Sequence, residues 1–140
     1  MKVVLDTNVL VAALRSSNGA SYALISSLPS PQWTPALSVP LYIQYQDVLL
    51  RPGVVPTTFT PNDILVFCRY LASVSHLQEI HFLWRPYLPD RGDDMVLELA
   101  VAAQARYIIT HNTRDFREVE NLGVAPIRPA EFLRLIRTMP

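Results

Sequence analysis

Residues 2–14 read KVVLDTNVLVAAL, and this stretch decides the fold class. Its first four residues form an apolar, β-branched run that predicts a short buried strand. Asp6 ends the run, and Thr7 or Asn8 can cap a helix directly after it. The apolar residues that follow repeat with the spacing of one helix face: Val9, Leu10, Ala13 and Leu14. A strand that passes straight into a helix is a typical opening of an α/β fold.

The same alternation continues along the chain. Apolar stripes with helical spacing predict five further helices, at residues 20–28, 38–51, 60–72, 93–104 and 129–137. Other runs predict strands at 32–34, 107–110 and 123–127, an extended edge segment within 76–84, and loops at 85–92 and 111–116. Strands separated by helices form a mostly parallel sheet that is covered on both faces. We therefore predict a single domain, residues 1–140, folded as a three-layer α/β/α sandwich around a sheet of about four or five strands.

The composition agrees with a folded, cytoplasmic protein. Half of the 140 residues are apolar and only 17% are charged, which argues against bulk disorder. The formal net charge is zero, so bulk positive charge does not hold nucleic acid here, although every basic residue except Lys2 is an arginine. Cys68 is the single cysteine and cannot form an intrachain disulfide, and no secretory or membrane-spanning pattern is evident.

Three acidic residues are attached to elements of the predicted core. Asp6 follows the first strand, Asp93 begins a helix that is apolar nearly all round, and Asp115 follows the strand at 107–110. Sites in parallel sheets lie beyond the carboxyl ends of the strands, so we expect these acids to converge. Converging carboxylates repel one another unless a cation intervenes, and oxygen ligands favour Mg²⁺ or Mn²⁺ over zinc. Each acid taken alone can also be explained as a helix cap or a turn residue.

Four blocks of sequence resemble the PIN domain, the family found in VapC-like toxins. They are VVLDTNVL at residues 3–10, a helix that ends in DVLLRP at 47–52, Asp93 with Ala100 seven residues later, and YIITHNTRDF at 107–116. Together they span nearly the whole chain, and residues 54–87 are the least diagnostic. The resemblance implies a divalent-metal-dependent ribonuclease, commonly the toxin of a type II toxin–antitoxin pair.

The resemblance also implies a role for individual residues. The catalytic and metal-binding acids would be Asp6, Asp93 and Asp115, which would hold one or two Mg²⁺ or Mn²⁺ ions. Four polar residues would support them: Thr7, Asn8, Gln44 and Asn112. Apart from the resemblance, we expect Arg114, Arg91 or Arg15 to contact the flanking phosphates of RNA, although an arginine beside acids is also a common salt-bridge partner.

Gln44 is a departure from the family pattern, because relatives usually carry Glu at this place. The residue lies on the apolar stripe of the 38–51 helix, so we expect its side chain to face a site or a buried partner. Glutamine keeps a carbonyl ligand but loses a negative charge, which predicts weaker Mg²⁺ binding. Two alternatives remain open: Asp47 or Glu79 supplies the missing charge, or the chain is a degenerate PIN domain that binds RNA or a partner protein without cutting.

The resemblance further implies protein partners, namely a small cognate antitoxin and a second copy of the chain. Five aromatic residues offer either apolar contact surface for such partners or ordinary core packing: Trp33, Tyr42, Tyr45, Phe82 and Trp84. Two other classes fit poorly. Phosphatases of the haloacid-dehalogenase kind need a second Asp where Asn8 stands, and dinucleotide-binding domains need a glycine-rich turn after the first strand.

Overall fold

The structure is a computed structural model, and it describes residues 1–80 and 91–140. Five strands are present in this part: β1 Lys2–Leu5, β2 Thr34–Leu37, β3 His76–Leu77, β4 Tyr107–Ile109 and β5 Ala125–Ile127. Six α-helices and one 3₁₀ helix connect them: α1 Thr7–Arg15, α2 Ala20–Ser26, α3 Val39–Leu49, α4 Pro61–Ser73, α5 Arg91–Ala102, η1 Thr113–Leu122 and α6 Pro129–Arg137. The predicted alternation of strands and helices is confirmed.

The five strands form one parallel sheet in the order β3-β2-β1-β4-β5. The chain first builds outward from β1 to β2 and β3, and then crosses to β4 on the other side of β1. The strand order therefore reverses between β1 and β4, where Val3 lies opposite Tyr107 and Leu5 opposite Ile109. In open α/β sheets, ligands bind at such a switch point, beyond the carboxyl ends of the strands.

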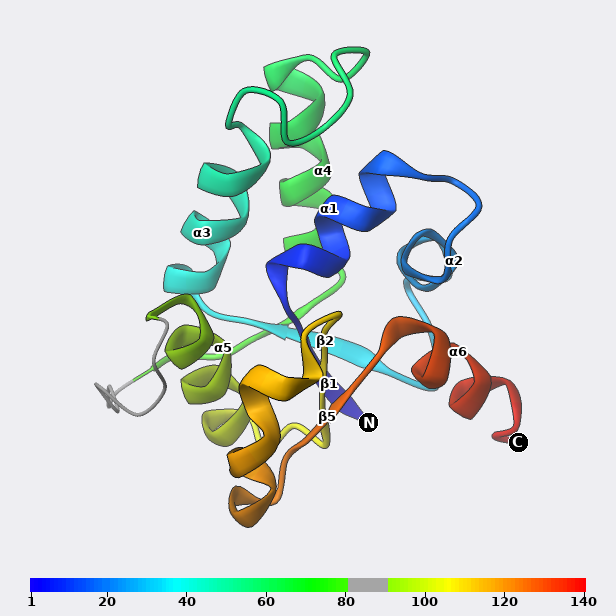
Figure 1. The fold of residues 1–140 in the computed structure, drawn as a ribbon, viewed down its shortest axis with the longest axis vertical. Coiled ribbons are helices and arrows are strands. Elements are labelled where there is room, and N and C mark those ends of the chain that lie inside the picture. The colour runs from blue at the N-terminus through cyan, green and yellow to red at the C-terminus, as the bar shows by residue number, and fades with distance from the viewer. Residues whose placement is uncertain (81–90) are drawn as a thin grey trace.

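The helices lie in groups around the sheet (Figure 1). Helix α5 packs on β1, β2 and β4 and contacts η1. Helix α2 packs against both α1 and α6. Helices α3 and α4 pair with each other, and α3 also reaches α1 and α5. This arrangement brings α1, α3 and α5 together around the end of β1, which is the point where Asp6 leaves the sheet. Within the described residues, no helix has the length and apolar content needed to cross a membrane.

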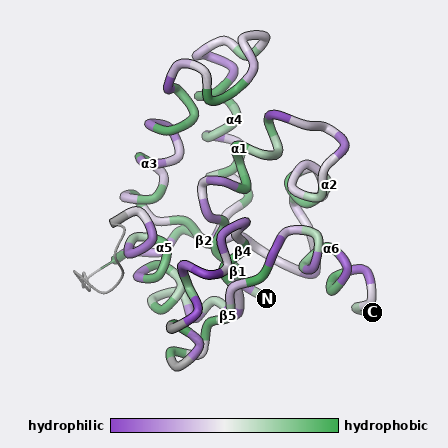
Figure 2. Tube along the Cα trace, in the orientation of Figure 1, coloured by the Kyte–Doolittle hydropathy of each residue, from purple (hydrophilic) through white to green (hydrophobic). Residues whose placement is uncertain are grey.

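The core occupies the sheet and the inner helix faces, as the hydropathy along the chain shows (Figure 2). Trp33 and Tyr45, two aromatic residues with potential for surface contacts, are instead buried. Trp33 packs edge-on against Phe132 of α6, with ring centroids 5.5 Å apart. The Tyr45 hydroxyl donates a short hydrogen bond to the Leu5 carbonyl, which fixes α3 to the end of β1.

Four predicted elements differ from the observed ones. The strand predicted at 32–34 is β2 at Thr34–Leu37, so the two share only Thr34. Residues 113–122 form η1 where the sequence suggests a polar loop, and Phe116 and Val119 are buried three residues apart, at the repeat of a 3₁₀ helix. The predicted edge segment within 76–84 is a strand only at His76–Leu77, and its residues 81–84 lie outside the described part. Helix α5 begins at Arg91, two residues before the predicted start at Asp93.

Candidate active site

Asp6 occupies the end of β1 and is the N-cap of α1. Its backbone is extended, and its amide donates to the Ile109 carbonyl at 2.9 Å, so the residue is held against β4. The carboxylate is 8% exposed. Oδ1 accepts a 2.8 Å hydrogen bond from the backbone amide of Thr7, which is the capping bond. A carboxylate buried at a sheet edge in this way has a fixed position before any ligand arrives.

Thr110 fixes the second oxygen of that carboxylate. Its hydroxyl donates to Oδ2 of Asp6 at 2.8 Å, and the residue is fully buried directly after β4. The same hydroxyl oxygen accepts from the backbone amide of Asn112 at 3.0 Å. Thr110 thus joins Asp6 to the loop that follows β4. Sequence reasoning gave no role to this threonine, because nothing in the local pattern shows which strand lies beside β1.

Asn8 forms a second link across the same two segments. Its side-chain amide donates to Oδ2 of Asp6 at 3.3 Å and to Oγ1 of Thr110 at 3.4 Å. Its Oδ1 accepts from the backbone amide of His111 at 3.2 Å. The structure therefore brings Asp6, Thr7, Asn8 and the backbone of Asn112 together. The Asn112 side chain itself is exposed.

Gln44 enters this group from α3. Its Nε2 donates to the Thr7 hydroxyl at 3.2 Å, which confirms that the residue faces inward. Its Oε1 is buried and has no hydrogen-bond partner among the described residues. A buried carbonyl oxygen without a donor costs about 1–3 kcal/mol. The side chain that carries this oxygen is hydrogen-bonded to Thr7, the residue directly after Asp6. The oxygen is therefore available as a ligand for a cation or for a water molecule.

Helix α5 supplies further acids. Asp93 lies in its first turn and is half-buried. Asp94 is 1% exposed and Glu98, one turn later, is 5% exposed. Sequence reasoning assigned no role to Asp94 or Glu98, although an acid at every fourth position of an apolar helix is a visible signal. Helix α5 packs on β1, the strand that Asp6 follows, and on α3, the helix that carries Gln44.

The remaining predicted residues lie further outside. Asp115 and Arg114 are exposed in the first turn of η1, and the Asp115 amide donates to the Asn112 carbonyl at 3.1 Å. Arg15 donates from Nε to the Val54 carbonyl at 2.6 Å, which ties α1 to the loop after α3. Arg91 begins α5, and its side chain lies outside the described part.

Neither alternative source of the missing charge is buried beside Asp6. The Asp47 side chain is 64% exposed and pairs with Arg51 at 2.7 Å, and Glu79 is also exposed. Among the side chains that the structure describes, no three His, Cys, Asp or Glu residues lie close enough to form a metal centre by themselves. The oxygen donors at the site suit a hard cation, and the unpartnered Gln44 Oε1 fits such a ligand. The candidate metal site therefore has two buried oxygen ligands among the described residues: the Asp6 carboxylate and the side-chain carbonyl of Gln44.

Two pKa shifts report the electrostatics of the site. Burial, and then the negative charge of Asp6 and of Cys68, raise the pKa of the Tyr45 hydroxyl well above its usual value. Burial, and then the positive charge of Arg128, lower the pKa of His111, while Asp6 opposes this shift. Tyr45 therefore stays a neutral donor to the Leu5 carbonyl, and the neutral form of His111 is favoured at the edge of the site.

Comparison with known proteins identifies the family and the fold of the chain. The family profile described as PIN domain matches residues 2–114. The fold also resembles a chain of VapBC2 from Rickettsia felis, crystallised with a DNA fragment from its promoter, at a TM-score of 0.61. That match has 15% sequence identity and covers 91% of this chain and 98% of the other. The search of curated proteins finds no match. With the profile covering most of its length, the chain belongs to the PIN domain family.

Proposed function

We propose that this protein is a divalent-metal-dependent endoribonuclease and the toxin of a type II toxin–antitoxin pair, acting in the cytoplasm. PIN domains of VapC proteins are generally nucleases, and PIN nucleases generally use divalent metals. The observation that carries the proposal is the buried Asp6 carboxylate, which Thr7, Asn8 and Thr110 hold at the carboxyl ends of β1 and β4. This is where an α/β sheet places its ligand.

By the family resemblance Asp6, Asp93 and Asp115 would hold Mg²⁺ or Mn²⁺, with Gln44 as a neutral oxygen ligand; the three acids do not form one group among the described side chains, so metal binding would have to draw Asp93 and Asp115 towards Asp6. When bound, the metal would activate water and stabilise charge on the phosphate. The chain itself supplies the rest. Thr110 and Asn8 hold Oδ2 of Asp6, and Thr7 connects Asp6 to Gln44. Because each of these side chains is fixed by a neighbour, the acid does not have to be ordered when RNA binds.

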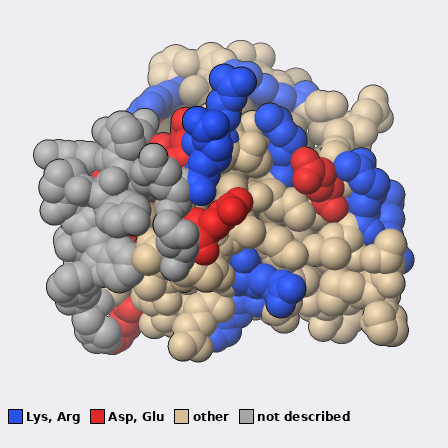
Figure 3. Space-filling view, turned by 60° about the horizontal axis from the view of Figure 1, so that its bottom comes forward, with Lys and Arg blue, Asp and Glu red and all other residues tan. Residues whose placement is uncertain are grey.

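RNA would bind through individual arginines rather than through a broad basic surface. Figure 3 shows a face on which Lys and Arg side chains stand between acidic ones and do not form a continuous stripe. Arg114 is exposed close to Asp115, which makes it a suitable phosphate contact. Arg91 and Arg15 remain candidates for the same role, with part of the Arg15 guanidinium engaged by Val54.

Cleavage of single-stranded RNA tests the proposal directly. The wild-type protein should cut in Mn²⁺ or Mg²⁺ and not in EDTA. Asp6→Asn should remove this activity, because it deletes the charge but keeps an oxygen that can cap α1. Asp47→Asn is the matched control, since Asp47 is exposed and paired with Arg51. Metal-dependent cleavage that survives in Asp6→Asn would refute the assignment.

A second candidate is a degenerate PIN domain that binds RNA or a protein without cutting it. Two observations favour it: Gln44 in place of the usual Glu, and the absence of a three-acid group among the described residues. Gln44→Glu separates the two functions. Robust cleavage that appears only in this variant would support the hypothesis of a degenerate, non-cleaving PIN domain, whereas cleavage by the wild type would exclude that hypothesis.

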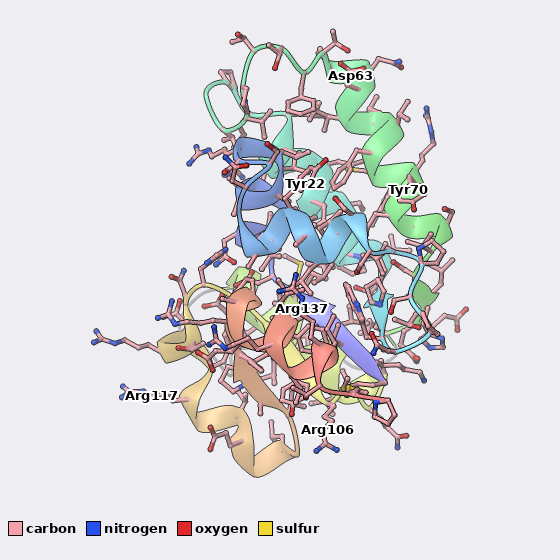
Figure 4. The ribbon with its side chains drawn as sticks, turned by 90° about the vertical axis from the view of Figure 1, so that its right-hand side faces the viewer. Tyr22, Asp63, Tyr70, Arg106, Arg117 and Arg137 are labelled. Atoms are coloured by element: carbon pink, nitrogen blue, oxygen red, sulfur yellow. The ribbon has the colours of Figure 1, made fainter. Side chains whose placement is uncertain are left out.

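Two exposed apolar surfaces are available for the proposed partners. Val39, Ile43 and Leu50 fall on one face of α3 and its C-cap and are exposed, which suits a self-complementary contact between two copies. Tyr22 of α2 and Tyr70 of α4, both labelled in Figure 4, line a pocket of about 450 Å³ that can receive apolar side chains of an antitoxin. Ile43→Asp should therefore shift a dimer towards monomer in sedimentation velocity and leave antitoxin binding intact.

A further inference from the structure

A second, smaller pocket lies beside the candidate active site, between α2 and α6. It has a volume of about 320 Å³, and its lining includes small apolar residues from both helices, among them Ala20 of α2 and Pro129 and Ala130 of α6. Its polar lining includes Ser21, His111 and Arg128. We call it the α2–α6 pocket. Its size is at the lower end of the range for small-ligand pockets, and a single nucleotide is a ligand of that class.

The polar side chains of this pocket are fixed by one another. Nε2 of His111 and the hydroxyl of Ser21 form a hydrogen bond of 3.1 Å, and Ser21 is only 3% exposed. Arg128 donates from one guanidinium nitrogen to the His111 carbonyl at 3.0 Å, while the residue as a whole is exposed. A guanidinium carries five N–H groups, so Arg128 can hold the His111 backbone and a phosphate at the same time.

The pocket is connected directly to the buried carboxylate. The His111 amide donates to Oδ1 of Asn8, and the Asn8 amide donates to Oδ2 of Asp6. The chain of contacts therefore runs from Asp6 through Asn8 and His111 to Arg128. These three hydrogen bonds, of 3.3, 3.2 and 3.0 Å, place the pocket next to the segments that hold Asp6.

We propose that the α2–α6 pocket is a nucleotide subsite, in which an unstacked RNA base lies among the small apolar residues of the lining and beside the His111 ring, and Arg128 binds the phosphate of that nucleotide. Single-stranded RNA is recognised through unstacked bases that stack on aromatic rings or guanidinium planes and hydrogen-bond through their edges, and His111 is the aromatic ring of this lining. The His111–Ser21 pair presents such hydrogen-bonding atoms in the pocket. The identification of the ligand as RNA rests on the proposed function, but the pocket and its polar group do not.

Binding of nucleoside 5′-monophosphates to the full chain in EDTA, followed by NMR shifts of backbone amides, tests the subsite without any turnover. We expect saturable shifts at Ala20, Ser21 and Ala130. Arg128→Gln should weaken binding at least about tenfold, and Ala130→Leu or Ala20→Leu, which fill the pocket, should abolish it. Arg137→Gln, on the same helix but outside the pocket lining, should bind as the wild type does.

Several outcomes would overturn the subsite. One is that Ala130→Leu or Ala20→Leu has the melting temperature of the wild type and still binds nucleotides equally well. Another is that the wild type binds no nucleotide at all. Inorganic phosphate that binds as tightly as a nucleotide would reduce the pocket to an anion site. The binding measurements are made without metal, so their result is independent of the cleavage assay. If the wild type binds nucleotides but does not cleave RNA, the proposed nuclease function is refuted and the subsite stands. If it cleaves RNA but does not bind nucleotides, the subsite is refuted and the nuclease function stands.

Discussion

The hydroxyl of Thr110 donates a 2.8 Å hydrogen bond to Oδ2 of Asp6, although the two residues are 104 positions apart in the sequence. Asp6 follows β1 and Thr110 follows β4, so the bond spans the point where the strand order reverses. Both side chains are buried. The bond therefore holds the central acid of the candidate site and also fixes the loop that carries His111 and Asn112.

Thr110→Val should destabilise the protein by about 1–3 kcal/mol, because it keeps the shape of the side chain but removes the 2.8 Å hydrogen bond to the buried Asp6 carboxylate, whose Oδ2 keeps only the longer 3.3 Å bond from Asn8 among those described above. The free energy of unfolding from urea titrations measures this loss. Thr110→Ser, which keeps the hydroxyl, is the matched control and should lose less. Equal stability of the valine variant and the wild type would show that Asp6 does not depend on this bond.

Part of this site can be read from the sequence. The run from Lys2 to Leu5 predicts a buried strand, and the acid directly after such a strand lies at the carboxyl edge of a parallel sheet. The inward direction of Gln44 also follows from its place on the apolar stripe of a helix. These inferences depend only on local periodicity, and the structure agrees with each of them.

Other parts of the site cannot be read in this way. The role of Thr110 depends on β4 lying beside β1, and strand order is set by tertiary packing rather than by any local pattern. Trp33 and Tyr45 show the same limit, since an aromatic residue fits a core or a surface equally well until its neighbours are known. Helix η1 did leave a signal: Phe116, Val119 and Leu122 recur every three residues, which is the period of a 3₁₀ helix.

His111 should titrate below its ordinary pKa of 6.5, because burial and then Arg128 favour its neutral form. The unfolded chain then binds a proton more readily than the folded one, so stability should fall as the pH drops below about 6.5. NMR titration of the His111 ring in EDTA measures the pKa. Arg128→Gln should raise it partway towards 6.5, and Arg137→Gln should leave it unchanged. A midpoint at or above 6.5 in the wild type would contradict the assigned environment.

Tyr45 should make stability depend on pH at the alkaline end. Its folded pKa lies well above 10, so the folded chain keeps a proton that the unfolded chain loses. The contribution of the hydroxyl is intact below about pH 10 and declines as the pH rises from there towards the folded pKa. Tyr45→Phe should cost about 1–2 kcal/mol at pH 8, because the Leu5 carbonyl loses its donor. The difference between the two proteins in urea unfolding should shrink above pH 10, and a constant difference would contradict the shift.

Gln44 should decide how strongly the site responds to metal. Gln44→Glu adds a second carboxylate next to the Thr7–Asp6 pair, so like-charge repulsion should lower the melting temperature in EDTA, and Mn²⁺ should restore it by a larger increment than in the wild type. Gln44→Leu removes the unpartnered oxygen and should show the smallest increment of the three. Thermal unfolding with and without Mn²⁺ gives the order directly. If all three proteins gain the same increment, position 44 does not face the metal, because neither an added charge nor a lost carbonyl would then be felt there.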